Sequence, residues 1–153
     1  AALGLALELG VLQLDADGQH DPKYLPVLLN ALKDADVVIG SRFLNGPTYR
    51  IPFFRRQGMR LFSFLSKRSG LNITDTTSGY RAYSAQAILE VLRIPWEYPD
   101  VNLLIALHRA GMRIVEVPVT MYANQTGKSM HSGFEPVRYV AITLLSLLRG
   151  RAG

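Results

Sequence analysis

The residues with the clearest chemical potential are two aspartates, Asp15 and Asp17, which follow directly on a short apolar run. In an extended segment residues i and i+2 project to the same side, so both carboxylates can face one ion, with the amide oxygen of Gln19 as a third ligand. Oxygen donors favour Mg²⁺ or Mn²⁺, and the chain has no cysteine that would favour a softer metal. The spacing predicts a divalent-cation site that holds a diphosphate, against the alternative of a solvated turn.

A second group of polar residues follows other apolar runs. Arg42 leaves the run Val37–Ile39 at the end of a predicted strand, where ligands bind in open α/β sheets. A guanidinium matches phosphate oxygens in bidentate fashion, so Arg42 is a candidate phosphate ligand, with a surface ion pair as the alternative. Ser78 and Gly79 would let the backbone approach a ligand closely. Arg81 would pair with phosphate or support the nearby Asp75.

In their order these segments resemble the family 2 glycosyltransferases, and within them the polyprenyl-phosphate sugar transferases. The resemblance runs over almost the whole chain. The segments that carry it are DADGQHDP from Asp15 to Pro22, Gly40-Ser41-Arg42, D-x-x-S-G-Y-R from Asp75 to Arg81, the run from Gly111 to Val119, and Gly127-Lys128-Ser129.

The resemblance implies a GT-A fold, a nucleotide-sugar donor, a metal at Asp15 and Asp17, and a lipid-phosphate acceptor at the membrane surface. The resemblance makes Asp75 a base or a residue that orients the acceptor; the alternative is a purely structural role, as a turn or capping aspartate. A phosphate acceptor is already anionic near neutral pH, so Asp75 would only need to position it. Lys128 and Ser129 match a loop that closes over the phosphates.

The sequence departs from the family pattern in two places. The family usually carries an arginine three residues before Gly127, and this chain has Asn124, which puts one phosphate contact in doubt. Family members also open with a βαβ half that cradles the nucleotide, and this chain begins after it. We therefore expect the chain alone to be a poor transferase; the alternative is a non-catalytic remnant that acts as a binding or interaction module.

Alternating strand and helix patterns predict an α/β domain, read as a partial, Rossmann-like GT-A sheet with helices on both faces. Residues 1–122 would form the catalytic core, and residues 123–153 an acceptor loop and an amphipathic helix. The expected strands are Val11–Leu14 (buried and parallel), Val37–Ile39, Tyr80–Tyr83 and Arg113–Val117. The expected helices are Ala1–Leu9, a segment from Pro22 to Leu32 capped by Asp21, Phe53–Ser69, a segment capped by Ser84 that ends at Val91, Val101–Ala110 and Pro136–Arg149.

Composition describes one compact domain with an anionic partner. The 153 residues are 48% hydrophobic and 19% charged, with a net charge of +5 and a pI near 9.7. RNA-binding aromatic or GxxG patterns are missing, so phosphates and acidic lipids are favoured over nucleic acid. No apolar stretch is long enough to span a bilayer. The basic segment Arg55–Arg68 and the helix Pro136–Arg149 predict a cytoplasmic protein bound peripherally to membranes, and an exposed sheet edge predicts a homodimer.

Overall fold

Four short strands form one mixed sheet in the computed structural model, which describes residues 10–14, 19–46, 53–94 and 101–122. The strands are β1 (Val11–Gln13), β2 (Val37–Ser41), β3 (Arg81–Tyr83) and β4 (Ile114–Pro118), in the order β1-β3-β2-β4. β3 runs antiparallel to both β1 and β2, while β2 and β4 are parallel. The α/β class predicted from the sequence is confirmed.

The expectation that β1 would be a buried parallel strand is wrong. It pairs antiparallel with β3 and occupies an edge of the described sheet, where Val11 is 37% exposed. Since β3 lies between β1 and β2 and opposes both, the two outer strands of this trio point the same way. An apolar run of three or four residues does not reveal which neighbour it will meet. At the other edge of the described sheet, Pro118 ends β4, where a proline has no backbone N–H for a further strand pair.

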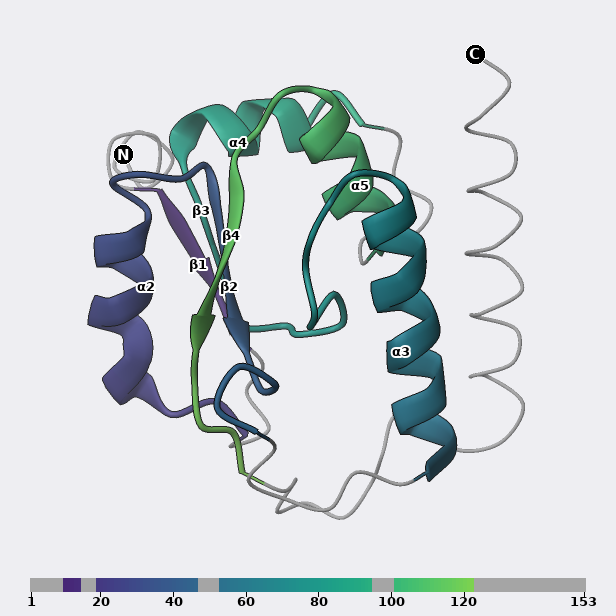
Figure 1. Cartoon of the computed structure of the whole chain (residues 1–153). Coiled ribbons are helices and arrows are strands. Elements are labelled where there is room, and N and C mark those ends of the chain that lie inside the picture. The colour runs from purple at the N-terminus through teal and green to yellow at the C-terminus, as the bar shows by residue number, and fades with distance from the viewer. Residues whose placement is uncertain (1–9, 15–18, 47–52, 95–100, 123–153) are drawn as a thin grey trace.

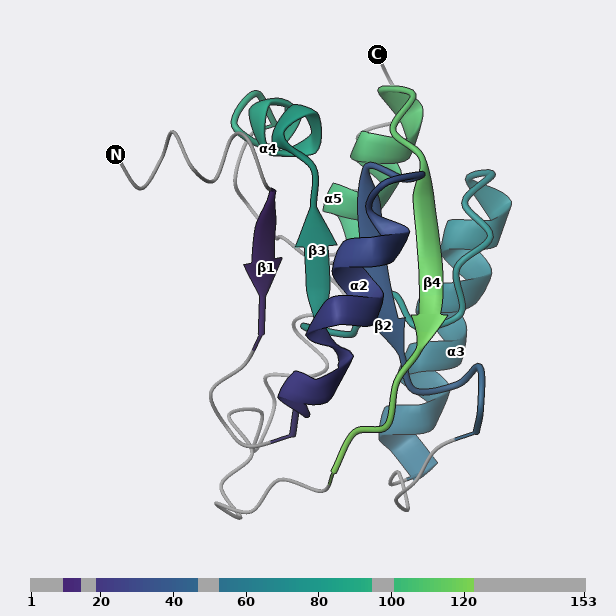
Figure 2. The ribbon, with the colours of Figure 1, turned by 90° about the vertical axis from the view of Figure 1, so that its left-hand side faces the viewer.

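Helices cover both faces of the sheet, as Figures 1 and 2 show. α2 (Leu25–Ala31) lies on one face, and α3 (Phe53–Arg68), α4 (Ala85–Val91) and α5 (Val101–Arg109) lie on the other. Successive strand residues point to opposite faces, so Val38 and Ala82 pack toward α2, and Val37, Ile39 and Tyr83 pack toward the three other helices. Two apolar cores result, one on each side.

The helix starts follow the predicted caps. The Asp21 carboxylate accepts from the Lys23 backbone N–H at 3.0 Å, and Ser84 Oγ accepts from the Ala87 N–H at 3.1 Å. Asp21 opens a short 3-10 helix, η1 (Pro22–Tyr24), before α2 begins. The Lys23 ammonium beside Asp21 lowers the pKa of that carboxyl below its ordinary value. Within α2, Leu28 is fully buried but Leu29 is 42% exposed, because Leu29 lies on a side of the helix that faces away from the sheet.

The register brings the ends of the strands into one row. Gln13, Arg81, Ile39 and Glu116 lie side by side across β1, β3, β2 and β4. The chain therefore leaves β1, β2 and β4, and enters β3, at one end of the sheet. That end, marked by the arrowheads of β2 and β4 in Figure 1, is where Gly40-Ser41-Arg42 and the segment Asp75–Arg81 meet.

Within the part of the chain that the structure describes, no helix combines the length and apolar character needed to cross a bilayer. The predicted helices Ala1–Leu9 and Pro136–Arg149 fall outside the described residues, as does the proposed unit 123–153.

Candidate functional site

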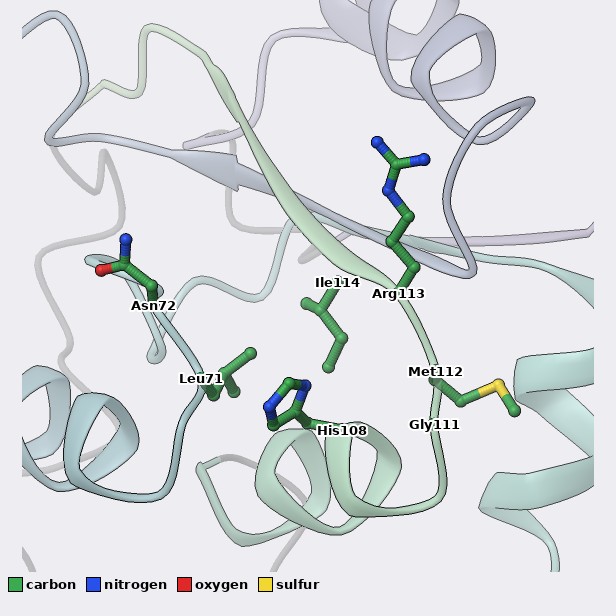
Figure 3. Close-up of a pocket in the computed structure, with 7 residues that line it drawn as sticks. All are labelled: Leu71, Asn72, His108, Gly111, Met112, Arg113 and Ile114. Atoms are coloured by element: carbon green, nitrogen blue, oxygen red, sulfur yellow. The ribbon is translucent and has the colours of Figure 1, made fainter.

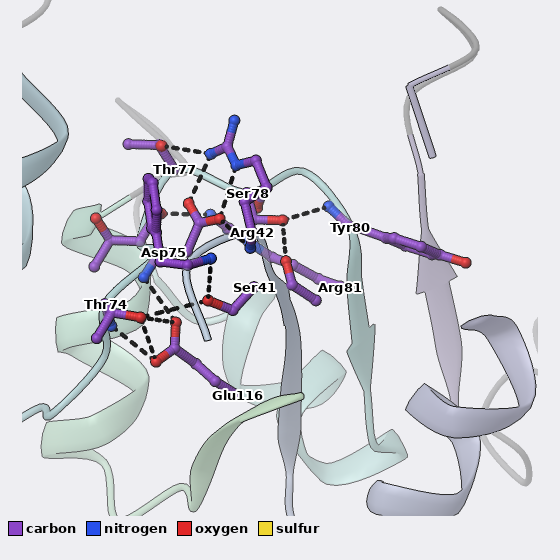
Figure 4. Close-up of polar contacts among 12 residues, drawn as sticks. Ser41, Arg42, Thr74, Asp75, Thr77, Ser78, Tyr80, Arg81 and Glu116 are labelled. Atoms are coloured by element: carbon purple, nitrogen blue, oxygen red, sulfur yellow. Dashed lines mark hydrogen bonds and ion pairs between the residues drawn. The ribbon is translucent and has the colours of Figure 1, made fainter. Parts of the chain in front are cut away.

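Arg42 and Asp75 form a buried ion pair where β2 ends (Figure 4). The guanidinium Nε and Nη2 donate to the two oxygens of Asp75 at 2.8 and 2.6 Å, and the Arg42 backbone N–H adds a third bond at 2.9 Å. Both side chains are buried, with 6% of Arg42 and none of Asp75 exposed. Nη2 also donates to Thr77 Oγ1 at 3.0 Å. This fork-to-fork geometry is the strongest form of a charge-assisted pair.

The loop that carries Asp75 is fastened from below by Glu116 of β4. One Glu116 oxygen accepts from the Asp75 backbone N–H at 2.7 Å and the other from the Thr74 N–H at 2.9 Å. The Thr74 hydroxyl donates to the same carboxylate at 2.9 Å and lies 3.4 Å from Ser41 Oγ. Figure 4 shows the carboxylate beneath the Thr74–Asp75 segment, with Arg42 on its other side.

Ser78 and Arg81 hold the rest of this loop through backbone contacts. Ser78 Oγ donates to the Gly40 carbonyl at 2.7 Å and accepts from the Tyr80 N–H at 3.2 Å. Arg81 donates to the carbonyls of Ser78 and Thr76 at 2.7 and 2.9 Å. These bonds tie the loop to the end of β2 and to the start of β3, so both residues shape the position of Asp75 rather than contacting its carboxylate.

The residues that follow the predicted metal loop reach the same end of the sheet. His20 stacks on Tyr80 with 4.7 Å between ring centroids, and the Tyr80 hydroxyl donates to the Asp21 carbonyl at 3.0 Å. Gln19 is held to Tyr122 by two hydrogen bonds of 3.1 Å. The side-chain nitrogen of Gln19 donates to the Tyr122 carbonyl, and the backbone carbonyl of Gln19 accepts from the Tyr122 N–H. Burial raises the pKa of the Tyr80 phenol. The segment after Asp17 is therefore anchored against the D-x-x-S-G-Y-R motif.

The structure thus brings together Arg42, Asp75, Ser78, Gly79 and Arg81, and leaves four predicted site residues undescribed. Asp15, Asp17, Lys128 and Ser129 lie outside the described residues, as does Asn124. Arg42 makes a buried ion pair, so the alternative of a surface pair is wrong. Asp75 binds that arginine through its carboxylate and also opens a turn, in which its carbonyl accepts the Ser78 N–H at 3.4 Å, so the alternative of a turn aspartate describes part of what is found.

The described residues fit a metal at the predicted place only in part. No cluster of three or more histidine, aspartate or glutamate side chains with metal-binding geometry occurs among them. The exit of β1 does lie at the same end of the sheet as the Arg42–Asp75 pair, and Gln19 is anchored there. Aspartate and glutamine oxygens form a hard donor set of the kind that Mg²⁺ and Mn²⁺ prefer.

A cavity of about 350 Å³ opens at the opposite end of the sheet, beside the start of β4 (Figure 3). Its lining consists of Leu71, Asn72, His108, Gly111, Met112, Arg113 and Ile114. His108 faces it from α5, but the lining holds no acidic side chain that would serve general acid–base chemistry with it. None of the residues of the Arg42–Asp75 site lines this cavity, so the cavity is separate from that site.

Glu116 is the residue that the sequence analysis missed. It stands in an alternating strand, Ile114-Val115-Glu116-Val117, where its face should carry an apolar side chain toward α3 and α5. A charged residue on the inward face of a strand is itself a signal of a buried polar partner. That signal was available in the sequence, but its partner, the Thr74–Asp75 backbone, was not.

Comparison with known proteins agrees with this geometry. The sequence model of the family named glycosyl transferase family 2 matches residues 10–92 of this chain. The chain is 38% identical to the undecaprenyl-phosphate mannosyltransferase of Micrococcus luteus, over 80% of this chain and 53% of that protein. It is 33% identical to the polyprenol monophosphomannose synthase of Mycolicibacterium smegmatis, over 80% and 49%. It is 29% identical to the dolichol-phosphate mannosyltransferase of Pyrococcus furiosus, over 83% and 38%.

The chain spans about half the length, or less, of these curated relatives. The family match covers β1, β2, β3 and the whole loop from Thr74 to Tyr80, so it includes Arg42 and Asp75 but not Glu116 of β4. On these grounds the chain belongs to glycosyl transferase family 2.

Proposed function

We propose that this chain carries the acceptor side of an enzyme that transfers a sugar from a nucleotide-sugar donor to a polyprenyl phosphate. The main observation behind this proposal is the buried Arg42–Asp75 pair, at the end of the sheet where Gly40-Ser41-Arg42 and the segment Asp75–Arg81 meet. The names of the three relatives compared above specify a polyprenyl-type carrier and mannose, which supports a lipid-phosphate acceptor and a mannosyl donor. Two further relatives share the dolichyl-phosphate carrier but are named for a hexose and for N-acetylglucosamine, so the acceptor has broader support than the sugar.

In this proposal Arg42 receives the acceptor phosphate. A guanidinium matches phosphate oxygens as it matches the two oxygens of Asp75, which engage its Nε and Nη2, and Asp75 thereby fixes the orientation in which Arg42 meets the phosphate. Asp75 then orients the incoming phosphate oxygen toward the sugar, and Arg81, Ser78 and Gly79 keep the loop in place. A phosphate monoester needs little deprotonation near neutral pH, so a positioned carboxylate is sufficient.

A divalent ion completes the proposal on the donor side. Asp15 and Asp17, with Gln19, would hold Mg²⁺ or Mn²⁺, which would stabilise the charge that develops on the departing nucleoside diphosphate. Lys128 and Ser129 would contact the phosphates. Asp17→Asn should abolish manganese-dependent donor binding; unchanged binding would place the metal elsewhere.

The acceptor proposal is tested by calorimetry with farnesyl phosphate, using farnesol as the ligand without phosphate. We expect binding of the phosphate alone, and a loss of about tenfold or more in Arg42→Lys, which keeps the charge but not the fork. Exposed Arg109→Lys is the matched control. Equal binding of farnesyl phosphate and farnesol would refute the proposal.

Transfer itself is measured with nucleoside-diphosphate mannose and Mn²⁺, in this chain alone and in a longer protein that contains it. We expect the chain alone to turn over slowly, since donor recognition contributes binding energy to the transition state. Phosphate binding with no turnover in either form would favour the alternative, a binding module without catalysis.

We also propose peripheral contact with acidic membranes through α3. Its outer side combines two exposed aromatic rings, Phe53 (64%) and Phe64 (60%), with the exposed cations Arg56, Arg60 and Lys67. Aromatic rings and basic side chains on one helix surface suit the headgroup region of an anionic bilayer. Co-sedimentation with anionic vesicles should weaken in Phe64→Ser but not in Leu92→Ser, an equally exposed apolar residue of the α4 side. Binding that ignores both salt and anionic lipid would contradict this.

A homodimer remains part of the proposal. β1 is an edge strand among the described residues; Val11 on it is 37% exposed, and Leu14, which follows it directly, is 45% exposed. Light scattering should give twice the chain mass, and a monodisperse monomer would exclude the dimer.

A further inference from the structure

The backbone of the Asp75 loop is held by the carboxylate of Glu116 from another strand, and this contact suggests a role for Glu116 that the sequence analysis did not assign. Glu116 lies in β4, opposite Ile39 of β2, and reaches past the end of β2 to the Thr74–Asp75 segment. Its two oxygens take two successive backbone N–H groups, at 2.9 Å from Thr74 and 2.7 Å from Asp75. Two successive amides aimed at one carboxylate fix the orientation of the peptide plane between them.

That peptide plane sets the direction of the Asp75 side chain. The Asp75 N–H bonds to Glu116 and the Asp75 carboxylate bonds to Arg42, so the residue is held at both ends. The Thr74 hydroxyl extends the contact, because it donates to Glu116 and lies 3.4 Å from Ser41 Oγ, next to Arg42 in the chain. Figure 4 shows this continuous path from Glu116 to the guanidinium.

Only a carboxylate with the length of glutamate satisfies this arrangement. All three partner groups, the two N–H groups and the Thr74 hydroxyl, donate to it. A glutamine would have one acceptor oxygen and would turn its NH₂ donor toward another donor. An aspartate would fall short of the loop by one methylene group.

We infer that Glu116 is a positioning residue for the acceptor site: it fixes the Thr74–Asp75 backbone so that Asp75 and Arg42 meet the acceptor phosphate in one geometry. This inference rests on the proposed function for its consequence, but the contact itself can be tested without it. Loss of the clamp should release the amides of Thr74 and Asp75 and weaken phosphate binding, while donor binding stays unchanged.

The experiment compares Glu116→Gln with Asp36→Asn. Asp36 is a matched control, since it is a partly buried carboxylate that also accepts a backbone N–H, from Arg113 at 2.8 Å, and a hydroxyl, from Ser84 at 3.3 Å. Farnesyl phosphate affinity should fall about tenfold to a hundredfold in Glu116→Gln, as expected for a lost charge-assisted clamp, and stay within about twofold in Asp36→Asn. Urea denaturation of both variants shows whether they lose similar stability.

Hydrogen exchange provides the second readout. Glu116→Gln should accelerate exchange at the Thr74 and Asp75 amides, and Asp36→Asn should accelerate it at the Arg113 amide alone. If Glu116→Gln does not fold, Thr74→Val removes one of the three contacts and should weaken phosphate binding by a smaller factor. A wild-type chain that binds no farnesyl phosphate refutes the proposed function, whereas wild-type binding that Glu116→Gln leaves intact overturns this inference.

Discussion

The two ends of the central sheet use the same kind of contact for different purposes. At one end the Asp36 carboxylate, just before β2, accepts the Arg113 N–H, and the Asp36 carbonyl accepts the Ser84 N–H at 2.8 Å. This fastens the start of β4 and the cap of α4 to the start of β2. At the other end Glu116 fastens a loop in the same way, but that loop also carries a buried ion pair.

The difference lies in what each contact holds. At the Asp36 end the contact satisfies two backbone N–H groups, those of Arg113 and Ser84, and serves only to hold the chain together. The Glu116 end buries Asp75 and Arg42, although a buried ion pair is weak evidence for stability and is often no better than apolar residues. A buried pair therefore needs an explanation besides stability, and the binding role proposed for Arg42 and Asp75 supplies one.

The largest effect in this comparison should come from breaking the pair on one side. Asp75→Ala leaves the Arg42 guanidinium buried without its carboxylate and should lower the free energy of unfolding by about 3–5 kcal/mol. The double variant Arg42→Met/Asp75→Leu should regain most of that stability and still fail to bind farnesyl phosphate. Urea denaturation and calorimetry measure the two properties. Equal destabilisation in the single and double variants would show that the pair is structural.

A smaller effect is expected at the other end. Asp36→Ala removes the acceptor of the Arg113 N–H and the Ser84 hydroxyl, and should cost about 1–3 kcal/mol of unfolding free energy. Phosphate affinity should not change. A loss of phosphate binding here comparable to that of Glu116→Gln would mean that the two ends are not independent.

Tyr80 allows a third test, because its hydroxyl anchors the segment after the predicted metal loop. Tyr80→Phe keeps the stack on His20 but removes the bond to the Asp21 carbonyl, at a cost of about 1 kcal/mol. We expect weaker metal-dependent donor binding with phosphate affinity intact. The reverse pattern would assign Tyr80 to the acceptor site.

The smallest effect is a pH dependence of stability. Burial raises the pKa of Tyr80 above the value of about 10 that it has in the unfolded chain. The contribution of Tyr80 to the free energy of unfolding is fully present below the unfolded-state pKa. It is lost as pH rises through the folded-state pKa, because the buried site disfavours the phenolate. Stability measured between pH 9 and pH 11 should decline less in Tyr80→Phe than in the wild type. Parallel decline would assign the alkaline loss to other groups.

The sequence by itself determined the α/β class, most helix bounds, the caps at Asp21 and Ser84, and the motif residues Arg42 and Asp75. These features depend on neighbours within a few positions: apolar spacing sets a helix or strand, and a side-chain oxygen caps an amide two or three residues on. The bounds of α3 illustrate this, since the predicted end at Ser69 and the observed end at Arg68 differ by one residue.

Tertiary structure alone decided which strands pair and which polar groups meet. β1 was wrongly expected to be buried and parallel because a short apolar run carries no information about its neighbour or its direction. Arg42 and Asp75 are 33 residues apart, and Glu116 is 41 residues beyond Asp75, so their contacts depend on the β2–β4 register. A hydrogen bond acts over about 3 Å, and only the folded sheet brings such distant residues that close.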